Sequence, residues 1–297
     1  MRAAAIFGPG ASEKDLKPFQ KNSQVSWLVG PLANPSEADA VLIFGGDGTV
    51  HRHLAQLVKL QLPVLAVPCG SGNDFARALD LRSFRIALAA WRNFCSGAGN
   101  VRTIDLGVIT PLITDLHVAT EPSAPHYFCC VGGVGLDAEI SRCANRLPRW
   151  LRARGGYVLS LVPALWKFAP VAMTISLPSV ENPNALVGRT TKATIVTAFA
   201  NAPSYGGGMK IAPQAQLDDG RLDVCVIGHM DKFKLFCLFP TVYFGGHLSV
   251  AQVEYFQTDR LKLETKEPHD VYADGEYVCR TPIEVSVARG ALGLIVP

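Results

Sequence analysis

Residues 45–49 read GGDGT, a short segment in which glycines flank an acidic side chain and a hydroxyl group follows. An apolar run precedes them at 40–44, and apolar residues at helical spacing follow at 50–60, so the sequence predicts a buried strand, a tight loop and a helix. Glycines let a backbone approach a ligand, and a helix N-terminus attracts anions through its free N–H groups and its dipole. The segment is typical of a phosphate-binding loop, in which Thr49 would cap the helix or donate to a phosphate oxygen.

A second glycine loop, PCGSGND at 68–74, follows the strand-like run PVLAVP at 63–68. Neighbouring parallel strands end at the same edge of a sheet, where α/β proteins bind ligands, so two such loops could grip two parts of one nucleotide. One loop alone could equally be a structural turn. The sequence has no GxxxxGK[ST] pattern, and the first strand-to-helix turn reads FGPGAS rather than GxGxxG, which excludes an ordinary P-loop enzyme and a standard dinucleotide fold. The expected nucleotide contacts are Gly45, Gly46, Asp47, Gly48 and Thr49 in the first loop and Gly70, Ser71, Gly72, Asn73 and Asp74 in the second.

Asp47 stands where a phosphate loop would carry no acid. A carboxylate beside a polyphosphate repels it unless a cation lies between them, and hard cations such as Mg²⁺ take oxygen ligands. Asp47 therefore indicates a bound Mg²⁺, held directly or through water. The alternative is that the carboxylate only ties the loop together through backbone N–H groups.

The rest of the first third alternates strand-like and helix-like patterns, which predicts a mostly parallel sheet with helices on its faces. From about residue 171 short strand-like runs separated by turn residues predict a sandwich or barrel. We therefore expect an α/β nucleotide-binding domain at 1–107 and a mainly-β domain at 108–297, and leave open whether the last residues pack back on the first. The expected strands are 3–7, 24–29, 40–44, 63–68, 171–177, 192–200, 222–228, 261–266, 271–278 and 283–288, and the expected helices are 12–21 (weakened by Pro18), 50–60, 74–80, 83–94 and 139–168.

Composition excludes several classes of protein. Hydrophobic residues make up 48% of the chain and charged residues 18%, as in a folded globular protein. The net charge of +3 is too small to indicate a nucleic-acid partner. The eight cysteines include no CxxC pair, and no apolar run is long enough to span a membrane. These features favour a cytoplasmic protein with free thiols.

Six segments together resemble one protein family. GGDGT at 45–49 resembles the signature shared by diacylglycerol kinases, sphingosine and ceramide kinases and, more distantly, NAD kinases and phosphofructokinases, whereas PCGSGNDFARAL at 68–79 is similar to the lipid-kinase version. The other matching segments are GLDAEI (135–140), RGGYVLS (154–160), the stretch from FANAPSYGGGM to LDVCVI (199–227) and YADGEYV (272–278). The resemblance covers nearly the whole chain. It implies a soluble ATP-dependent lipid kinase with an NAD-kinase-like α/β domain, a β-sandwich domain and an active site in the cleft between them.

The resemblance also implies roles for particular acids. Phosphoryl transfer needs a group that accepts the proton of the attacking hydroxyl, and the family pattern places it at Glu276, with Asp274 in support. A structural Mg²⁺ would take the side chain of Asp219 and the backbone carbonyls of Gln216 and Arg221. Without the family, these two segments would be interpreted as a solvated hairpin turn and a β-turn.

The sequence departs from the family pattern at three positions. Gly8 stands where asparagine is usual, and His51 and Arg52 replace an Asn-Glu pair after GGDGT. These departures keep two other interpretations open: a kinase with a soluble acceptor such as NAD, and a non-catalytic relative that binds nucleotide or lipid. The acceptor also stays open, since diacylglycerol, monoacylglycerol, a long-chain base and a polyprenol all offer a primary hydroxyl. The sequence allows a homodimer and does not demand one.

Residues 142–154, RCANRLPRWLRAR, contain five arginines, two leucines and a tryptophan, and no acid occurs between residues 140 and 180. A basic segment with an aromatic side chain suits the surface of an anionic bilayer. The Arg142–Arg154 segment is therefore a candidate for peripheral membrane contact with a lipid substrate. The alternative is a solvated helix face.

Overall fold

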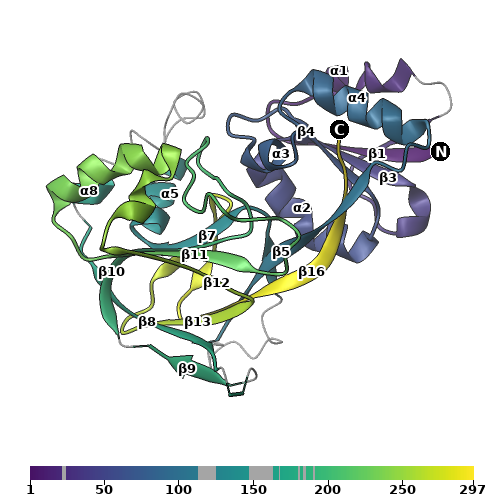
Figure 1. Cartoon of the computed structure of the whole chain (residues 1–297). Helices are drawn as coiled ribbons and strands as arrows, with labels where there is room; N and C mark the ends of the chain where they lie inside the picture. The colour runs from purple at the N-terminus through teal and green to yellow at the C-terminus, as the bar shows by residue number, and fades with distance from the viewer. Residues whose placement is uncertain are drawn as a thin grey trace. The chain divides into compact units, whose positions relative to one another are not determined.

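The computed structural model describes residues 1–21, 25–112, 125–146, 163–166, 168–179, 181–182, 185–189 and 191–297 (Figure 1). The chain forms two compact units. Unit 1 contains Met1–Leu106 and Arg289–Pro297, and unit 2 contains Gly107–Ala288. The boundary expected from the sequence lay between residues 107 and 108.

Unit 1 is built on a parallel sheet in the order β16-β4-β3-β1-β2. β3 is buried along its whole length, as its continuous apolar run predicts for a central strand. Figure 1 shows α1 and α4 on one side of this sheet and α2 on the other. The strands are β1 (Arg2–Phe7), β2 (Ser26–Val29), β3 (Ala40–Gly45), β4 (Val64–Pro68) and β16 (Ile283–Ile295), and the helices are α1 (Glu13–Leu16), η1 (Phe19–Lys21), η2 (Pro35–Glu37), α2 (Asp47–Leu60), α3 (Asp74–Ala78) and α4 (Phe84–Cys95).

The helix expected at 12–21 is shorter in the structure. It ends at Leu16, and a 3-10 turn at Phe19–Lys21 follows. Pro18 lies between the two pieces, and proline cannot donate the backbone hydrogen bond that would continue a helix. The helix expected at 50–60 begins earlier, at Asp47, so the last three residues of GGDGT form the first turn of α2.

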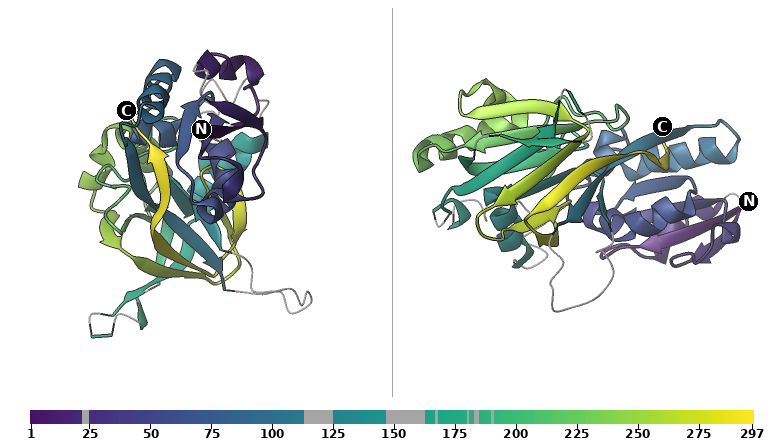
Figure 2. Two further views of the ribbon diagram at one scale, coloured as in Figure 1. Left: turned by 90° about the vertical axis from the view of Figure 1, so that its right-hand side faces the viewer. Right: turned by 90° about the horizontal axis from the view of Figure 1, so that it is seen from below.

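Two long strands have residues in both units. β5 (Val101–Pro111) pairs with β16, and Figure 2 shows the two strands running side by side. The end of β16 pairs in parallel with β4 through Leu294 and Val64, and Leu292, Leu294 and Ile295 are buried. The sheet of unit 1 is therefore completed by residues close to the C-terminal end of the sequence.

Unit 2 is an antiparallel assembly in the order β15-β14-β7-β10-β8-β13-β16, with β11 and β12 continuing from β10. One apolar core runs through these strands, in which the rings of Phe128 and Phe199 pack edge to face at 5.6 Å. The elements are β6 (His126–Phe128), β7 (Val131–Gly135), α5 (Leu136–Arg146), β8 (Val171–Pro178), β9 (Leu186–Gly188), β10 (Lys192–Ala200), β11 (Leu222–Gly228), α8 (Lys232–Leu238), η3 (Phe239–Phe244), η4 (Gly246–Ser249), β12 (Val253–Thr258), β13 (Arg260–Thr265), β14 (Asp270–Ala273) and β15 (Glu276–Arg280).

The structure describes only part of the basic helical region expected at 139–168. α5 extends to Arg146 and residues 163–166 are helical, whereas residues 147–162 lie outside the described ranges. The proposed membrane segment from Arg142 to Arg154 and the RGGYVLS motif fall mainly or wholly there. Among the helices that the structure describes, none is long and apolar enough to cross a membrane.

Candidate active site

The two glycine loops of unit 1 begin side by side. β3 and β4 are parallel neighbours in a register that places Gly45 opposite Pro68, and the N–H of Cys69 donates to the carbonyl of Gly45 at 3.0 Å. The loops therefore leave the same edge of the sheet, the edge at which parallel α/β sheets bind their ligands. This is the arrangement that the sequence predicted.

Glycine is required where the loops cross. A Cβ atom on Gly70 would lie 2.4 Å from the Cα of Gly46, so neither backbone could approach the other if a side chain were present. Asn73 braces the second loop: its side-chain oxygen accepts the N–H of Gly70 at 2.9 Å, and its amide nitrogen donates to the Gly70 carbonyl at 2.7 Å. Asn73 also has a positive φ of 53°, a conformation that asparagine tolerates better than most residues.

Asp47 joins the first loop to the helix that follows the second. One carboxylate oxygen accepts the N–H of Asp74 and the other accepts the N–H of Phe75, both at 3.0 Å. These are donors of the first turn of α3, which have no partner inside the helix. The loop-tying role considered from the sequence is therefore visible. A cation at Asp47 stays a prediction.

The side chains of the second loop differ in exposure. Asp74 is 1% exposed and forms an ion pair with Arg77, which also donates to the Gly72 carbonyl. Ser71 is exposed and faces solvent. Burial, with a smaller contribution from the Asp15 carboxylate, raises the pKa of Cys69 to about 11, so this thiol is protonated at neutral pH. Ser71 is therefore the side chain of the loop best placed to meet a ligand, whereas Asp74 supports the loop from within.

Thr49 explains the glycine at position 8. A Cβ atom on Gly8 would lie 2.1 Å from the Thr49 hydroxyl oxygen, and one on Gly45 would lie 2.5 Å from it. Thr49 is buried between the ends of β1 and β3, so this backbone arrangement leaves no room for a side chain at position 8. Arg52 is accommodated within its own helix, because its Nε donates to the Gly48 carbonyl at 2.9 Å.

In unit 2, the segment expected to carry the proton acceptor is a tight hairpin. Asp274 and Gly275 have φ of 51° and 82° and connect β14 to β15, as an Asp-Gly dipeptide does in a two-residue turn. Glu276 follows the turn, opposite Ala273, and is partly exposed. Among the described residues, no group donates a hydrogen bond to the Glu276 carboxylate. A general base needs a lone pair open to its substrate, and Glu276 offers one.

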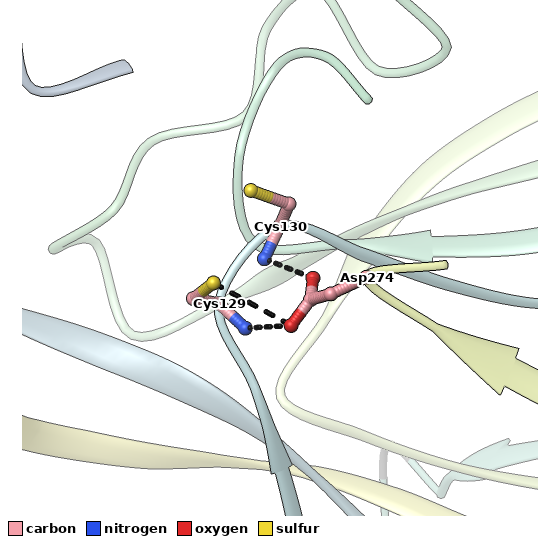
Figure 3. A group of neighbouring side chains, drawn as sticks. All are labelled: Cys129, Cys130 and Asp274. Carbon is pink, nitrogen blue, oxygen red and sulfur yellow. Dashed lines mark hydrogen bonds between the residues drawn. The ribbon is translucent and has the colours of Figure 1, made fainter. Parts of the chain in front are cut away.

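Asp274 has the opposite environment. Its carboxylate is buried and accepts the backbone N–H groups of Cys129 at 2.9 Å, Cys130 at 2.8 Å and Val131 at 3.3 Å. Figure 3 shows its oxygens directed at the first two nitrogens, while the Cys130 thiol points away. The two thiols and the carboxylate lie close enough to be considered as metal ligands. The N–H groups already bind the carboxylate, however, so its evident role is to hold the hairpin of Glu276 against residues 129–131.

The expected structural metal site lies in a turn before β11. Asp219 is exposed and accepts the Arg221 N–H at 3.0 Å, and Gln216 is exposed as well. The sequence did not single out Asp223, which is fully buried and accepts the Tyr255 hydroxyl at 2.6 Å and the Gln257 amide. Burial raises the pKa of Asp223, and the Asp219 carboxylate contributes in the same direction. Two carboxyl groups therefore lie at or near the turn, and hard cations take oxygen ligands of this kind.

Two of the family-like motifs meet in unit 2. The Tyr205 hydroxyl, from the APSYGGGM segment, donates to the Asp137 carboxylate of GLDAEI at 2.6 Å. Asp137 is 5% exposed, so this bond is sheltered from water. The bond joins segments 68 residues apart in the chain. It gives the buried Asp137 carboxylate a hydrogen-bond partner, as buried polar groups need.

Residues 15–109 match the family model described as the diacylglycerol kinase catalytic domain, and residues 131–296 match the YegS C-terminal NAD kinase beta sandwich-like domain. A diacylglycerol kinase of Mycobacterium tuberculosis is 31% identical over 259 residues, which cover 87% of this chain and 77% of the relative. The chain belongs to the diacylglycerol kinase family. It is an enzyme of the lipid-kinase type, and kinases of this kind use ATP.

Other relatives agree with this assignment. A protein of Bacillus subtilis named putative lipid kinase YtlR is 26% identical, with 85% of this chain and 78% of the relative covered. A crystal structure of a putative diacylglycerol kinase from Bacillus anthracis has a TM-score of 0.72 at 19% identity and covers 100% of this chain and 97% of its own. An NAD kinase from Archaeoglobus fulgidus in complex with ATP has a TM-score of 0.52 at 12% identity, with 99% and 93% covered. The diacylglycerol kinase fold, an NAD-kinase-like α/β unit with a β-sandwich, is thereby confirmed.

Proposed function

We propose that this enzyme transfers the γ-phosphoryl group of ATP to a primary hydroxyl of a diacylglycerol-like lipid. The observation that carries the proposal is the crossing of two glycine loops at one edge of a parallel sheet, in a chain of the lipid-kinase family. The backbone of Gly46, Gly48 and Thr49 and the hydroxyl of Ser71 would contact the nucleotide. Asn73 and Asp47 would hold the two loops in place.

The reaction forms one O–P bond and breaks another. The lipid hydroxyl oxygen attacks the γ-phosphorus, the β,γ-bridging oxygen leaves with ADP, and the hydroxyl proton passes to the Glu276 carboxylate. Glu276 suits this role because its carboxylate is partly exposed and, within the described residues, unbound. Asp274 suits a positioning role because the backbone bonds it accepts fix the turn that precedes Glu276.

The residues present also fit Mg²⁺, which when bound would neutralise phosphate charge. Hard cations prefer oxygen ligands, and both candidate sites offer them. The Asp47 carboxylate would hold one ion near the nucleotide. The Asp219 carboxylate with the carbonyls of Gln216 and Arg221 would hold a second, structural ion, in a turn next to the buried acid Asp223.

The experiment that tests the function is a transfer assay with γ-labelled ATP. The purified protein is incubated with lipid extracts and, separately, with NAD, and labelled products are identified by mass. We expect a phosphorylated lipid carrying an acyl-glycerol backbone. Label on NAD alone would identify a soluble-acceptor kinase, and ATP binding without any labelled product would identify a non-catalytic relative.

Replacing the proposed base gives a sharper test. Glu276→Gln keeps the size of the side chain and removes its ability to take a proton, so we expect kcat to fall about 10²- to 10⁴-fold while ATP affinity stays the same. Glu267→Gln, an exposed glutamate elsewhere in unit 2, serves as the matched control and should behave like the parent. Parent-like turnover in Glu276→Gln would show that another group accepts the proton.

A further inference from the structure

An unusual set of aromatic side chains is exposed at α8 of unit 2 and the segments beside it. Phe233 and Phe236 are 77% and 51% exposed, Phe244 at the end of η3 is 86% exposed, and Trp166 is 73% exposed. Single exposed apolar residues are ordinary on a protein surface, but a group of large aromatic ones indicates an interaction site. None of these four residues has a part in the proposed chemistry.

α8 has two different faces. Leu235 and Leu238 are buried beneath it, whereas Phe233 and Phe236, three residues apart and so on one side of the helix, point to solvent. Figures 1 and 2 show α8 on the outside of the strands of unit 2. The buried face already anchors the helix to the unit, so the exposed phenylalanines are not needed for folding.

The segments that carry these aromatic residues are connected to α8 by a hydrogen bond or by the chain itself. The Lys232 ammonium group at the start of α8 donates to the Trp166 carbonyl, which brings the helical turn at 163–166 next to α8. η3 follows α8 directly in the chain, and Phe244 is its last residue. We call this surface the α8 patch and define it as Trp166, Lys232, Phe233, Lys234, Phe236 and Phe244.

The charge of the α8 patch is positive. It contains two lysines, and the sequence has no acid from residue 232 to residue 253. The acid just before, Asp231, caps the helix by accepting the Lys234 N–H at 2.8 Å. In the part of the chain that the structure describes, neither lysine is ion-paired: Lys234 donates to the amide oxygen of Gln252, and Lys232 to a carbonyl. Both positive charges are therefore available to an anionic partner.

We propose that the α8 patch docks the enzyme on the surface of an anionic phospholipid bilayer. The inference rests on the proposed function, since an enzyme that phosphorylates a membrane lipid must reach a bilayer. Aromatic rings bury favourably at the boundary between headgroups and acyl chains, and lysines beside them attract anionic headgroups. Exposed phenylalanines and a tryptophan near two lysines match both parts of such a boundary.

A second copy of the chain fits this surface less well. Twofold symmetric association would place the patch against itself, which brings the lysines of one copy near those of the other. Like charges at an interface oppose association, whereas an anionic bilayer attracts all of them. The positive charge of the patch therefore favours binding to an anionic membrane over self-association.

Sedimentation with vesicles tests the proposal. The full chain is mixed with vesicles of phosphatidylcholine alone or of an equimolar mixture with phosphatidylglycerol. The triple variant Phe233→Ser/Phe236→Ser/Phe244→Ser should lose about tenfold or more in partitioning onto the mixed vesicles, because the inserting rings are gone. Lys232→Gln/Lys234→Gln should lose about fivefold per lysine on the mixed vesicles and little on phosphatidylcholine. Val187→Ser, which removes another exposed apolar side chain of unit 2, should bind like the parent.

Three further measurements make each outcome decisive. The melting temperatures of the variants should match the parent, since the altered side chains are exposed, and light scattering reports the oligomeric state. Unchanged sedimentation of the triple variant with mixed vesicles would overturn the proposal, and so would loss of self-association without loss of vesicle binding.

Phosphoryl transfer to a short-chain diacylglycerol that dissolves as monomers separates docking from chemistry: the triple variant should retain this activity. A parent that binds vesicles through the patch but phosphorylates no lipid would refute the proposed function and leave the docking surface standing.

Discussion

Asp47 and Asp274 have the same local role in the two units. Each carboxylate accepts backbone N–H groups from a segment far along the chain: Asp47 from the start of α3, and Asp274 from residues 129–131. Hydrogen bonds to an ionised acceptor are shorter and stronger than neutral ones. Each acid thereby fixes a turn on which a proposed functional group sits.

Asp274→Asn tests this role in unit 2. An asparagine retains one acceptor oxygen, but its NH₂ group would face an N–H donor, so at least one buried backbone group loses its partner. We expect the free energy of unfolding to fall by about 1–3 kcal/mol, measured by urea denaturation. Asp259→Asn, at an exposed position, is the control. An unchanged denaturation midpoint for Asp274→Asn would mean that the carboxylate does not anchor the hairpin.

Asp47→Asn separates loop-tying from cation binding in unit 1. Both roles predict some loss of stability, since one of the two N–H groups that Asp47 binds loses its acceptor. Only the cation role also predicts a raised Mg²⁺ requirement, by about 10- to 100-fold, measured by titrating the metal at saturating ATP. A variant that is less stable but has the parent's Mg²⁺ dependence would leave Asp47 with the structural role alone.

Among the elements, the two glycine loops form one unit because their backbones touch. Gly70→Ala would place a methyl group 2.4 Å from the Gly46 Cα, so the loops must separate. We expect ATP affinity to fall at least tenfold and stability to fall by about 1–3 kcal/mol, as in overpacked sites. Gly188→Ala is a matched control, because its Cβ would meet nothing closer than 3.4 Å. Calorimetric titration with a non-hydrolysable ATP analogue measures the affinity, and an unaltered value would rule out the crossing as part of the nucleotide site.

The sequence predicted the elements around these loops well because their signals are local. The apolar run of β3, the glycines of both loops and the helical spacing of α2 all lie within a few residues of one another. The Asp-Gly turn of the β14–β15 hairpin is equally local. By contrast, the partners of Asp274 lie about 145 residues earlier in the chain, and nothing in the spacing of Cys129 and Cys130 identifies them. The close approach of Gly8 to Thr49 is likewise created only by the fold.

The α8 patch escaped the sequence for a different reason. Phenylalanines and leucines alternate through residues 233–239, and in a sequence this looks like a buried segment. Only the fold shows that the leucines are buried while Phe233 and Phe236 are exposed. A core consists mostly of apolar residues, but an apolar residue is not always buried. A surface that binds a partner uses the same large apolar side chains as a core, so the sequence alone does not distinguish the two.

On the scale of the whole molecule, the nucleotide-binding sheet depends on residues distant in sequence. Arg289–Pro297 belong to unit 1, where β16 pairs with β4, Asn100 donates to the Val296 carbonyl and the Gly290 N–H donates to Asp105. β4 leads directly into the second glycine loop. Loss of β16 would therefore expose the strand that positions Gly70 and Asn73.

A chain shortened to end at Ala288 tests this dependence. It loses the buried side chains of Leu292, Leu294 and Ile295, and each such side chain contributes about 2–5 kcal/mol in a core. Their sum is comparable to the total stability of a typical domain, about 5–15 kcal/mol, so unit 1 should lose its cooperative melting transition and its ATP binding. A chain that lacks only Pro297, which is exposed, should melt like the parent. Binding of ATP by the shortened chain would show that the sheet of unit 1 holds its loops without residues 289–297, and the point variant Leu294→Ala would then be expected to leave activity intact as well.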